Sequence, residues 1–233
     1  MSTLSELRTR ARRLADAVGN NFFADAEVDD YINIGLGELH DILVSKFEDY
    51  SVSSISFSLV KDQSEYTFSS IGLSNFYKSL GVDLIDGNDT VRIPRYSFQE
   101  RNAFSENSAY YSRSGRKNLR YNINGTSMMF TPTPAEAYTI KLWYVPQFSK
   151  LSNDSDSVSN NIATNWEDYA VTMAALKMRQ KEETSTTSLE RELDRLTARI
   201  EEASRNRDAG EPMSITDEGM GQTVTSSEYN NWP

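Results

Sequence analysis

Residues 24–47 read A-D-A-E-V-D-D-Y-I-N-I-G-L-G-E-L-H-D-I-L-V-S-K-F. Apolar residues return in this stretch at intervals of three and four, which predicts an amphipathic helix with one buried face. The predicted stripe consists of Val28, Tyr31, Ile32, Gly35, Leu36, Leu39, Ile42, Leu43 and Phe47. We expect Asp25 to cap this helix, and the acidic residues that follow it lie near the positive end of the helix dipole.

Two glycines, Gly35 and Gly37, lie inside the predicted helix. A phosphate-binding turn would follow a strand and would have a third glycine, and this stretch has neither feature. The glycines therefore predict close packing against a second helix, despite a cost of about 1 kcal/mol each relative to alanine.

A shorter helix is expected before residue 24. Thr3 and Glu6 have the spacing of a capping box, which predicts that the helix begins there. Its predicted buried face consists of Leu4, Leu7, Ala11, Leu14 and Val18. The turn-forming residues 19–21 are expected to end it.

The period changes to two in the middle of the chain, which predicts an antiparallel β domain over residues 51–150. Turn sequences at 86–89 and 124–125 each separate two apolar runs and predict two hairpins. Residues 98–104 are expected to form a short helix, and residues 105–118 a polar loop that is mobile or bound to a partner. The strands are expected near residues 55–59, 66–68, 80–85, 91–93, 120–123, 128–130 and 137–145.

Two further helices are expected after a polar linker at 151–163. The pairs Thr164/Glu167 and Thr187/Glu190 have capping-box spacing. The last helix carries Leu189, Leu193, Leu196, Ile200 and Ala203, a run too short for a coiled coil, so an intramolecular helical hairpin is expected.

These elements predict an α+β fold in which helices from both ends of the chain form one layer around an inserted antiparallel β domain. The expected divisions are N-terminal helices at 1–50, the β domain at 51–150, the linker and C-terminal helical hairpin at 151–207, and an extended C-terminal arm at 208–233. The arm contains acidic residues and no Lys or Arg, and its composition is too polar to form a core.

Composition excludes several classes of function. The 233-residue chain has a formal charge of -10, which argues against broad, non-specific binding to nucleic acid. It has no cysteine, which excludes disulfides, thiolate metal sites and cysteine nucleophiles. No apolar run approaches the length that spans a membrane, so no membrane partner is expected.

No residues have the pattern of a catalytic, metal or cofactor site. The only histidine, His40, is followed by Asp41, but adjacent side chains on a helix point about 100° apart. We expect a surface or hydrogen-bonded histidine. The pairs Asp86/Asp89 and Asp154/Asp156 lie in turn sequences, where aspartate bonds the local backbone. An enzyme is therefore not expected.

Two segments are candidates for binding a partner. Residues 92–120 carry seven basic side chains interleaved with tyrosines, and Arg113, Arg116 and Lys117 are grouped within them. This pattern fits a nucleic-acid surface or contact with an acidic neighbouring subunit, and we favour the second. In the arm, the candidate anchors are Met213, Ile215, Met220, Tyr229 and Trp232.

Taken in order, several pieces of the sequence resemble the head-to-tail adaptor proteins of tailed bacteriophages, which dock on the portal. The pieces are L-R-T-R-A-R-R-L-A-D at 7–16, D-A-E-V-D-D-Y-I-N-I-G-L-G-E-L at 25–39, Y-S-F-Q-E-R-N at 96–102, F-T-P-T-P at 130–134 and the helix at 166–178. The resemblance extends over residues 3–205. No single piece is diagnostic, whereas their order and spacing are fairly specific.

The resemblance implies a non-enzymatic structural protein of the virion neck, assembled in the host cytoplasm. Such a protein forms a ring, with twelvefold symmetry expected, that connects the portal to the tail or nozzle. Double-stranded DNA passes through its channel without sequence-specific binding. By the same analogy, the arm would grip a neighbouring subunit or the portal. The alternatives are a nucleic-acid-binding module that uses residues 92–120, or another neck component such as a stopper or tail terminator.

Overall fold

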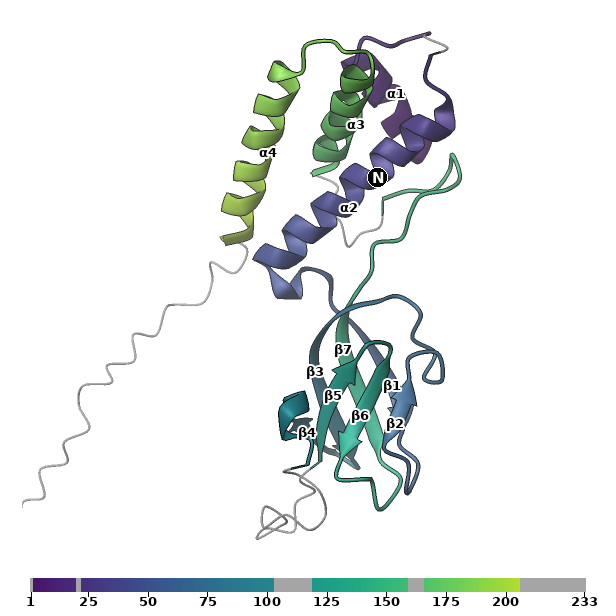
Figure 1. Ribbon diagram of the computed structural model, residues 1–233, viewed down its shortest axis with the longest axis vertical. Helices are drawn as coiled ribbons and strands as arrows, with labels where there is room; N and C mark the ends of the chain where they lie inside the picture. Colours follow the sequence, from purple (N-terminus) through teal and green to yellow (C-terminus); the bar gives the residue numbers. More distant parts are fainter. Residues whose placement is uncertain (1, 20–21, 103–118, 159–165, 206–233) are drawn as a thin grey trace, which may run out of the picture.

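The computed structural model describes residues 2–19, 22–102, 119–158 and 166–205. These ranges form an α+β fold with a helical layer at one end and a β sandwich at the other (Figure 1). The helices are α1 (Leu4–Leu14), α2 (Asp25–Lys46), α3 (Glu167–Lys181) and α4 (Thr187–Arg205), with short 3-10 helices η1 (Glu48–Ser51) and η2 (Phe98–Glu100). The strands are β1 (Ser53–Ser58), β2 (Glu65–Thr67), β3 (Phe76–Asp86), β4 (Asp89–Ile93), β5 (Arg120–Asn124), β6 (Ser127–Thr131) and β7 (Thr139–Pro146).

The helical layer is built from the two ends of the chain, and α3 lies at its centre. α3 packs against α1, α2 and α4, so its side chains are buried on more than one face. The predicted stripes of α2 and α4 contribute Ile32, Leu36, Leu39, Leu196 and Ile200 to this core. The expected helical hairpin of α3 and α4 is confirmed.

The capping box of α1 is confirmed, but the predicted end of that helix is wrong. Glu6 N–H donates to Thr3 Oγ1 at 3.3 Å, and Thr3 N–H donates to Glu6 Oε2 at 3.0 Å. The helix ends at Leu14, and Asp16 turns the chain with a φ of 60°. Leu14 and Val18 therefore leave the predicted buried face, with exposed fractions of 42% and 71%.

The other predicted caps also differ from the structure. Ala24 precedes α2 with no side-chain cap, because the Asp25 carboxylate accepts from Arg12 Nη2 at 2.8 Å instead. Trp166 precedes α3, Thr164 lies outside the described residues, and the buried Glu167 accepts from Ser2 N at 3.2 Å. At α4 the hydroxyl that bonds Glu190 belongs to Thr186 (2.7 Å) rather than to Thr187.

The β sandwich consists of two antiparallel sheets in the described residues. The larger has strand order β1-β7-β3-β4 and the smaller β2-β6-β5. Both predicted hairpins are confirmed, with Asp86 opposite Asp89 in the first and Asn124 opposite Ser127 in the second. The helix expected at 98–104 is the single turn η2. The core between the sheets includes Leu59, Val82, Met128, Ile140 and Leu142.

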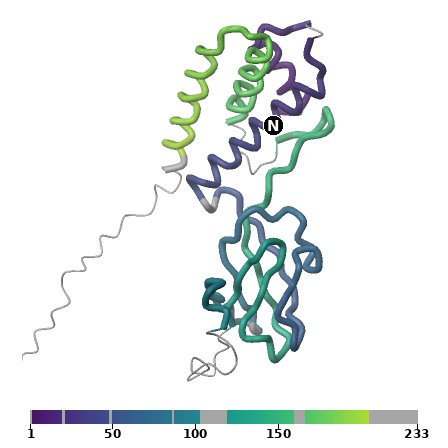
Figure 2. Tube along the Cα trace, viewed as in Figure 1, coloured from purple at the N-terminus to yellow at the C-terminus, as the bar shows by residue number. Residues whose placement is uncertain are grey.

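The sandwich is an insertion between α2 and α3 (Figure 2). The chain leaves the helical layer through η1, and it returns after β7 through residues 147–158. The two parts have separate apolar cores. Contacts around these crossings therefore decide how the sandwich is held on the helices.

Candidate interaction surfaces

The predicted partner-binding residues lie outside the part of the chain that the structure describes. This applies to Arg113, Arg116 and Lys117 in the basic segment and to Met213, Ile215, Met220, Tyr229 and Trp232 in the arm. The described basic residues that flank the first group are Arg92, Arg95, Arg101 and Arg120.

Those flanking arginines lie on neighbouring segments of the sandwich, and we call them the basic tip (Arg92, Arg95, Arg101 and Arg120). Arg92 lies on β4, and Arg95 forms an isolated β-bridge with Tyr121, directly after Arg120 at the start of β5. Arg101 follows η2 and stacks over the Phe98 ring, 4.7 Å from its centroid. The fold thus brings together basic residues that are up to 28 positions apart in sequence.

A hollow of about 590 Å³ adjoins the basic tip. Its walls come from residues 95–98 and 100 on one side and from 122–124 of β5 on the other. Asn122 Nδ2 donates to Tyr96 O at 2.8 Å, and burial raises the pKa of Tyr96. Ser97 N–H donates to Glu100 Oε2 at 3.2 Å, so the carboxylate on this wall holds the turn. Cationic, aromatic and amide groups of this kind suit an acidic protein surface.

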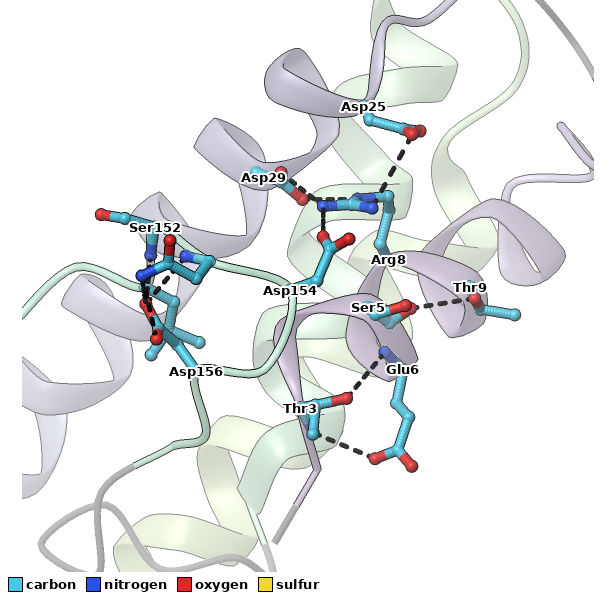
Figure 3. Close-up of polar contacts among 12 residues, drawn as sticks. Thr3, Ser5, Glu6, Arg8, Thr9, Asp25, Asp29, Ser152, Asp154 and Asp156 are labelled. Carbon is cyan, nitrogen blue, oxygen red and sulfur yellow. Dashed lines mark hydrogen bonds and ion pairs between the residues drawn. The ribbon is translucent and has the colours of Figure 1, made fainter.

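The arginines of α1 do not form a second basic surface, because acidic partners inside the helical layer engage three of them. Arg8 donates from Nε and Nη2 to the two carboxylate oxygens of Asp29, each at 2.7 Å, and from Nη2 to Asp154 Oδ1 at 2.7 Å (Figure 3). Asp29 holds the pKa of Arg8 above its ordinary value. The Arg8 and Asp29 side chains are only 14% and 19% exposed.

The other two engaged arginines extend this network to α3 and to the start of α2. Arg10 pairs with Glu167 and with Asp168. Arg12 donates from Nη2 to Phe23 O and to Asp25 Oδ1, each at 2.8 Å. Sequence reasoning missed this network, although an arginine-rich helix followed by an acidic one is a signal that could have found it.

The chain after β7 is tied into the same network (Figure 3). Asp156 Oδ2 accepts from the backbone N–H groups of Ser152 and Asn153, each at 2.8 Å, and these bonds lower the pKa of Asp156. The turn role expected for Asp154 and Asp156 is confirmed for Asp156, whereas Asp154 binds Arg8. Asn33 adds a buried link, since its side chain bonds both the N–H and the carbonyl of Leu151.

His40 lies at the joint between the helices and the sandwich. It is 5% exposed, and its Nε2 donates to Pro146 O at 3.1 Å, which confirms the prediction of a hydrogen-bonded histidine. The ring packs edge-on against Tyr77 of β3, whose hydroxyl donates to Asp41 Oδ1 at 2.9 Å. His40 Nδ1 lies 3.6 Å from Asp41 Oδ1, which is too long for a hydrogen bond. The cluster therefore joins two parts of the fold.

An apolar patch at the far end of the helical layer consists of Leu14, Val18 and Phe22, which are 42%, 71% and 54% exposed. Phe22 packs edge-on against the buried Phe23, and Lys181 Nζ lies over both rings. Lys181 Nζ also donates to Glu27 Oε1 at 2.6 Å, and this contact lowers the pKa of Glu27. This patch lies on the helical layer, whereas the basic tip lies on the sandwich (Figure 1).

No group of three or more His, Cys, Asp or Glu side chains in the described residues could hold a metal ion. No helix formed by these residues has the length and apolar character needed to cross a membrane.

The model of a family described as SU10 adaptor protein matches residues 2–216. The matched range contains every helix and strand described above. No curated protein matches the chain.

Proposed function

Because the chain belongs to the SU10 adaptor protein family, we propose that it forms a ring that connects the portal to the tail or nozzle of a bacteriophage and continues the DNA channel. The family is a structural, non-enzymatic class, and its members interact with other phage proteins of the head and tail. The observation that carries the proposal is the extent of the match, which takes in both the helical layer and the sandwich.

The distribution of charge supports assembly from identical subunits. The chain carries a formal charge of -10, yet three arginines of the basic tip, Arg92, Arg95 and Arg101, are exposed. A positive tip on a negative protein favours contact between the tip of one copy and an acidic surface of another. Arg113, Arg116 and Lys117 belong to the same segment, and we assign them to this contact.

We propose a separate role for each expected segment of the chain. Residues 1–50 and 151–207 form the layer that packs between subunits and against the portal, and residues 51–150 form the sandwich. Residues 208–233 form an arm whose anchors are Met213, Ile215, Met220, Tyr229 and Trp232. One docked subunit would raise the local concentration of its neighbours' arms, so these anchors add avidity to the ring.

The proposed setting is the neck of the virion, with assembly in the host cytoplasm and twelvefold symmetry. Double-stranded DNA passes through the channel without sequence-specific contacts. A net negative protein suits this role, because a strongly attractive lumen would hold the polymer instead of letting it slide.

The test is size determination by light scattering and negative-stain imaging, on the purified protein alone and mixed with portal rings. A ring that forms on the portal supports the proposal. If the protein stays monomeric, does not bind portal rings and binds DNA in a salt-sensitive way, the nucleic-acid-binding alternative would replace this proposal. A ring that binds tail proteins but not the portal would favour a stopper or tail terminator.

A further inference from the structure

One edge of the larger sheet is open in the described part of the chain. β1 is the outermost strand there, and among the described residues it pairs with β7 alone. β2, the outermost strand of the smaller sheet, lies on the same side of the sandwich (Figure 1). Both sheets therefore end at this side.

The ladder between β1 and β7 shows which backbone groups face outward. Leu59 N–H donates to Tyr138 O at 2.7 Å, one pair beyond Ser58 and Thr139. Antiparallel pairs alternate along a ladder, so the N–H and C=O groups of residues 54, 56 and 58 point away from β7. The side chains of these serines are exposed, whereas Ile55 and Phe57 pack on the sandwich core.

The edge also lacks the features that usually block strand addition. Natural edge strands carry charged residues, proline or bulges, and Ser53–Ser58 (S-S-I-S-F-S) has none of them. Val52 and Val60 beside it are 44% and 54% exposed. The opposite edge strand, β4, contains Asp89 and Arg92 and is followed by Pro94. The contrast indicates that β1 is suited to receive an extended segment.

We propose that residues 222–227 of a second copy of this chain add to β1 as a further strand, an inference that rests on the proposed ring. The segment reads Q-T-V-T-S-S, with three consecutive β-branched residues and no charge or proline, which suits a neutral edge. It lies beyond the family match, which ends at residue 216.

Reach and position favour a second copy as the source. The residues between Arg205 and Gln222 span up to about 50 Å when extended, at roughly 3.3 Å per residue. α4 ends on the side of the molecule away from β1 and β2 (Figure 1). The arm therefore starts on the far side of its own subunit from β1, and we assign the strand that fills this edge to an adjacent subunit.

Disulfide trapping tests the contact directly, because the chain has no native cysteine. Full-length protein carrying Ser54→Cys is mixed with differently tagged full-length protein carrying either Val224→Cys or Thr225→Cys, under conditions in which imaging shows rings. We expect a cross-link between the two tags from only one of these neighbouring arm positions, because adjacent side chains of a strand face opposite sides. The exposed Ser188→Cys on α4 measures random cross-linking.

A matched pair of variants then tests the backbone edge. Ser56→Pro removes the outward N–H, and Ser56→Ala removes only the hydroxyl. In the Ser54→Cys background we expect proline to lower the cross-linked fraction at least tenfold and alanine to leave it unchanged, with both variants keeping the wild-type thermal transition. If the proline variant does not fold, Ser56→Lys supplies an edge charge in its place.

The outcomes separate this inference from the proposed function. Rings that give no more cross-linking than the Ser188→Cys control would overturn the strand addition and leave the ring standing. In a further preparation, both cysteines are placed on one chain; a cross-link within that chain, with none between the mixed single-cysteine proteins, would overturn the second copy as the source. Absence of rings, alone and on the portal, would instead remove the proposed function.

Discussion

Gly35 decides how closely two helices of the core can approach. A Cβ atom built on Gly35 would lie 2.8 Å from Ala170 Cα and 3.1 Å from Ala170 O, both atoms of the α3 backbone. A Cβ on Gly37, two residues later, would meet Phe148 Cδ1 at 3.8 Å, an ordinary contact. The close packing expected from the sequence is therefore confirmed for Gly35, while Gly37 approaches no helix so closely.

The two glycines supply a matched experiment at this scale. Gly35→Ala should destabilise the protein by about 1–3 kcal/mol, because the α3 backbone has to shift to admit a methyl group. Gly37→Ala should be neutral or stabilising by up to about 1 kcal/mol, because alanine favours the helix and meets no backbone. Urea denaturation measures both, and equal effects of the two substitutions would contradict the assigned contact.

Asp156 is one carboxylate that contributes to stability in acid. The N–H groups of Asn153 and Ser152 hold the pKa of Asp156 below its ordinary value, so the folded state favours the charged form. Its contribution is complete above the unfolded pKa of about 4 and is lost as the pH falls through the lower folded value. Asp156→Asn should therefore lower the urea midpoint at neutral pH, and the midpoint of this variant should fall less than that of the wild type below about pH 4. An equal fall of the two midpoints in acid would refute this role.

At the scale of elements, Arg8 connects three segments that are far apart in sequence. It lies on α1, its bidentate partner Asp29 lies on α2, and Asp154 lies in the chain that returns from the sandwich. Bidentate arginine–carboxylate pairs are among the stronger polar contacts, and this one is mostly shielded from water. The network fixes the orientation of α1 against α2, while apolar burial supplies the bulk of the stability.

Removal of the Arg8 charge should be costly because Asp29 stays largely buried. Arg8→Gln should destabilise the fold by about 1–3 kcal/mol, below the range for fully buried pairs because both side chains retain some exposure. Arg13→Gln on the exposed face of α1 should change stability by less than about 0.5 kcal/mol. Thermal and urea unfolding of both variants provide the comparison, and a neutral Arg8→Gln would show that Asp29 finds other partners.

The helices, strands and turns could be predicted from local sequence patterns, whereas the contacts between them could not. The Thr3–Glu6 capping box, both hairpin turns and the apolar stripes depend on residues a few positions apart, so the sequence displays them directly. Asp25 has the local features of a cap, but Arg12 competes for its carboxylate through a contact that exists only once α1 and α2 pack. Leu14 and Val18 continue the stripe of α1, yet the turn at Asp16 removes them from the core.

At the scale of the whole molecule, two surface features besides the β1 edge suit contact with partners. The apolar patch of Leu14, Val18 and Phe22 is at the end of the helical layer, and the basic tip is on the sandwich. Sequence reasoning predicted the basic segment from its composition but not the hollow beside it, because residues 95–98 and 122–124 meet only in the folded sheet. The patch was not predicted, because Leu14 and Val18 were assigned to the buried face of α1.

Charge at the basic tip should govern self-association. Replacing the exposed Arg92 and Arg95 together by Glu should leave the thermal transition intact and weaken ring formation several-fold, most strongly at low salt where charge attraction is least screened. The matched control replaces the same two arginines by Lys, which keeps both positive charges in place. Sedimentation velocity at low and high salt measures the effect, and identical assembly of all three proteins would exclude the tip as a subunit contact.

The arm should matter for attachment and not for folding. Both apolar cores are assembled here from residues of the described ranges, the last of which ends at 205, so we expect deletion of residues 208–233 to retain the thermal transition. Binding to portal rings should weaken, because the proposed anchors are lost. Loss of the thermal transition in the truncated chain would show that the arm belongs to the core.

The insertion of the sandwich between α2 and α3 also orders events during synthesis. α1 and α2 emerge from the ribosome first. Their apolar faces stay uncovered until α3, at the centre of the helical layer, has been synthesised. α3 follows only after the whole sandwich has been made. At roughly 5–20 residues per second, the delay is on the order of ten seconds. The nascent chain can complete the sandwich before its first helices find their partners, so the helices synthesised first are among the last elements to become buried.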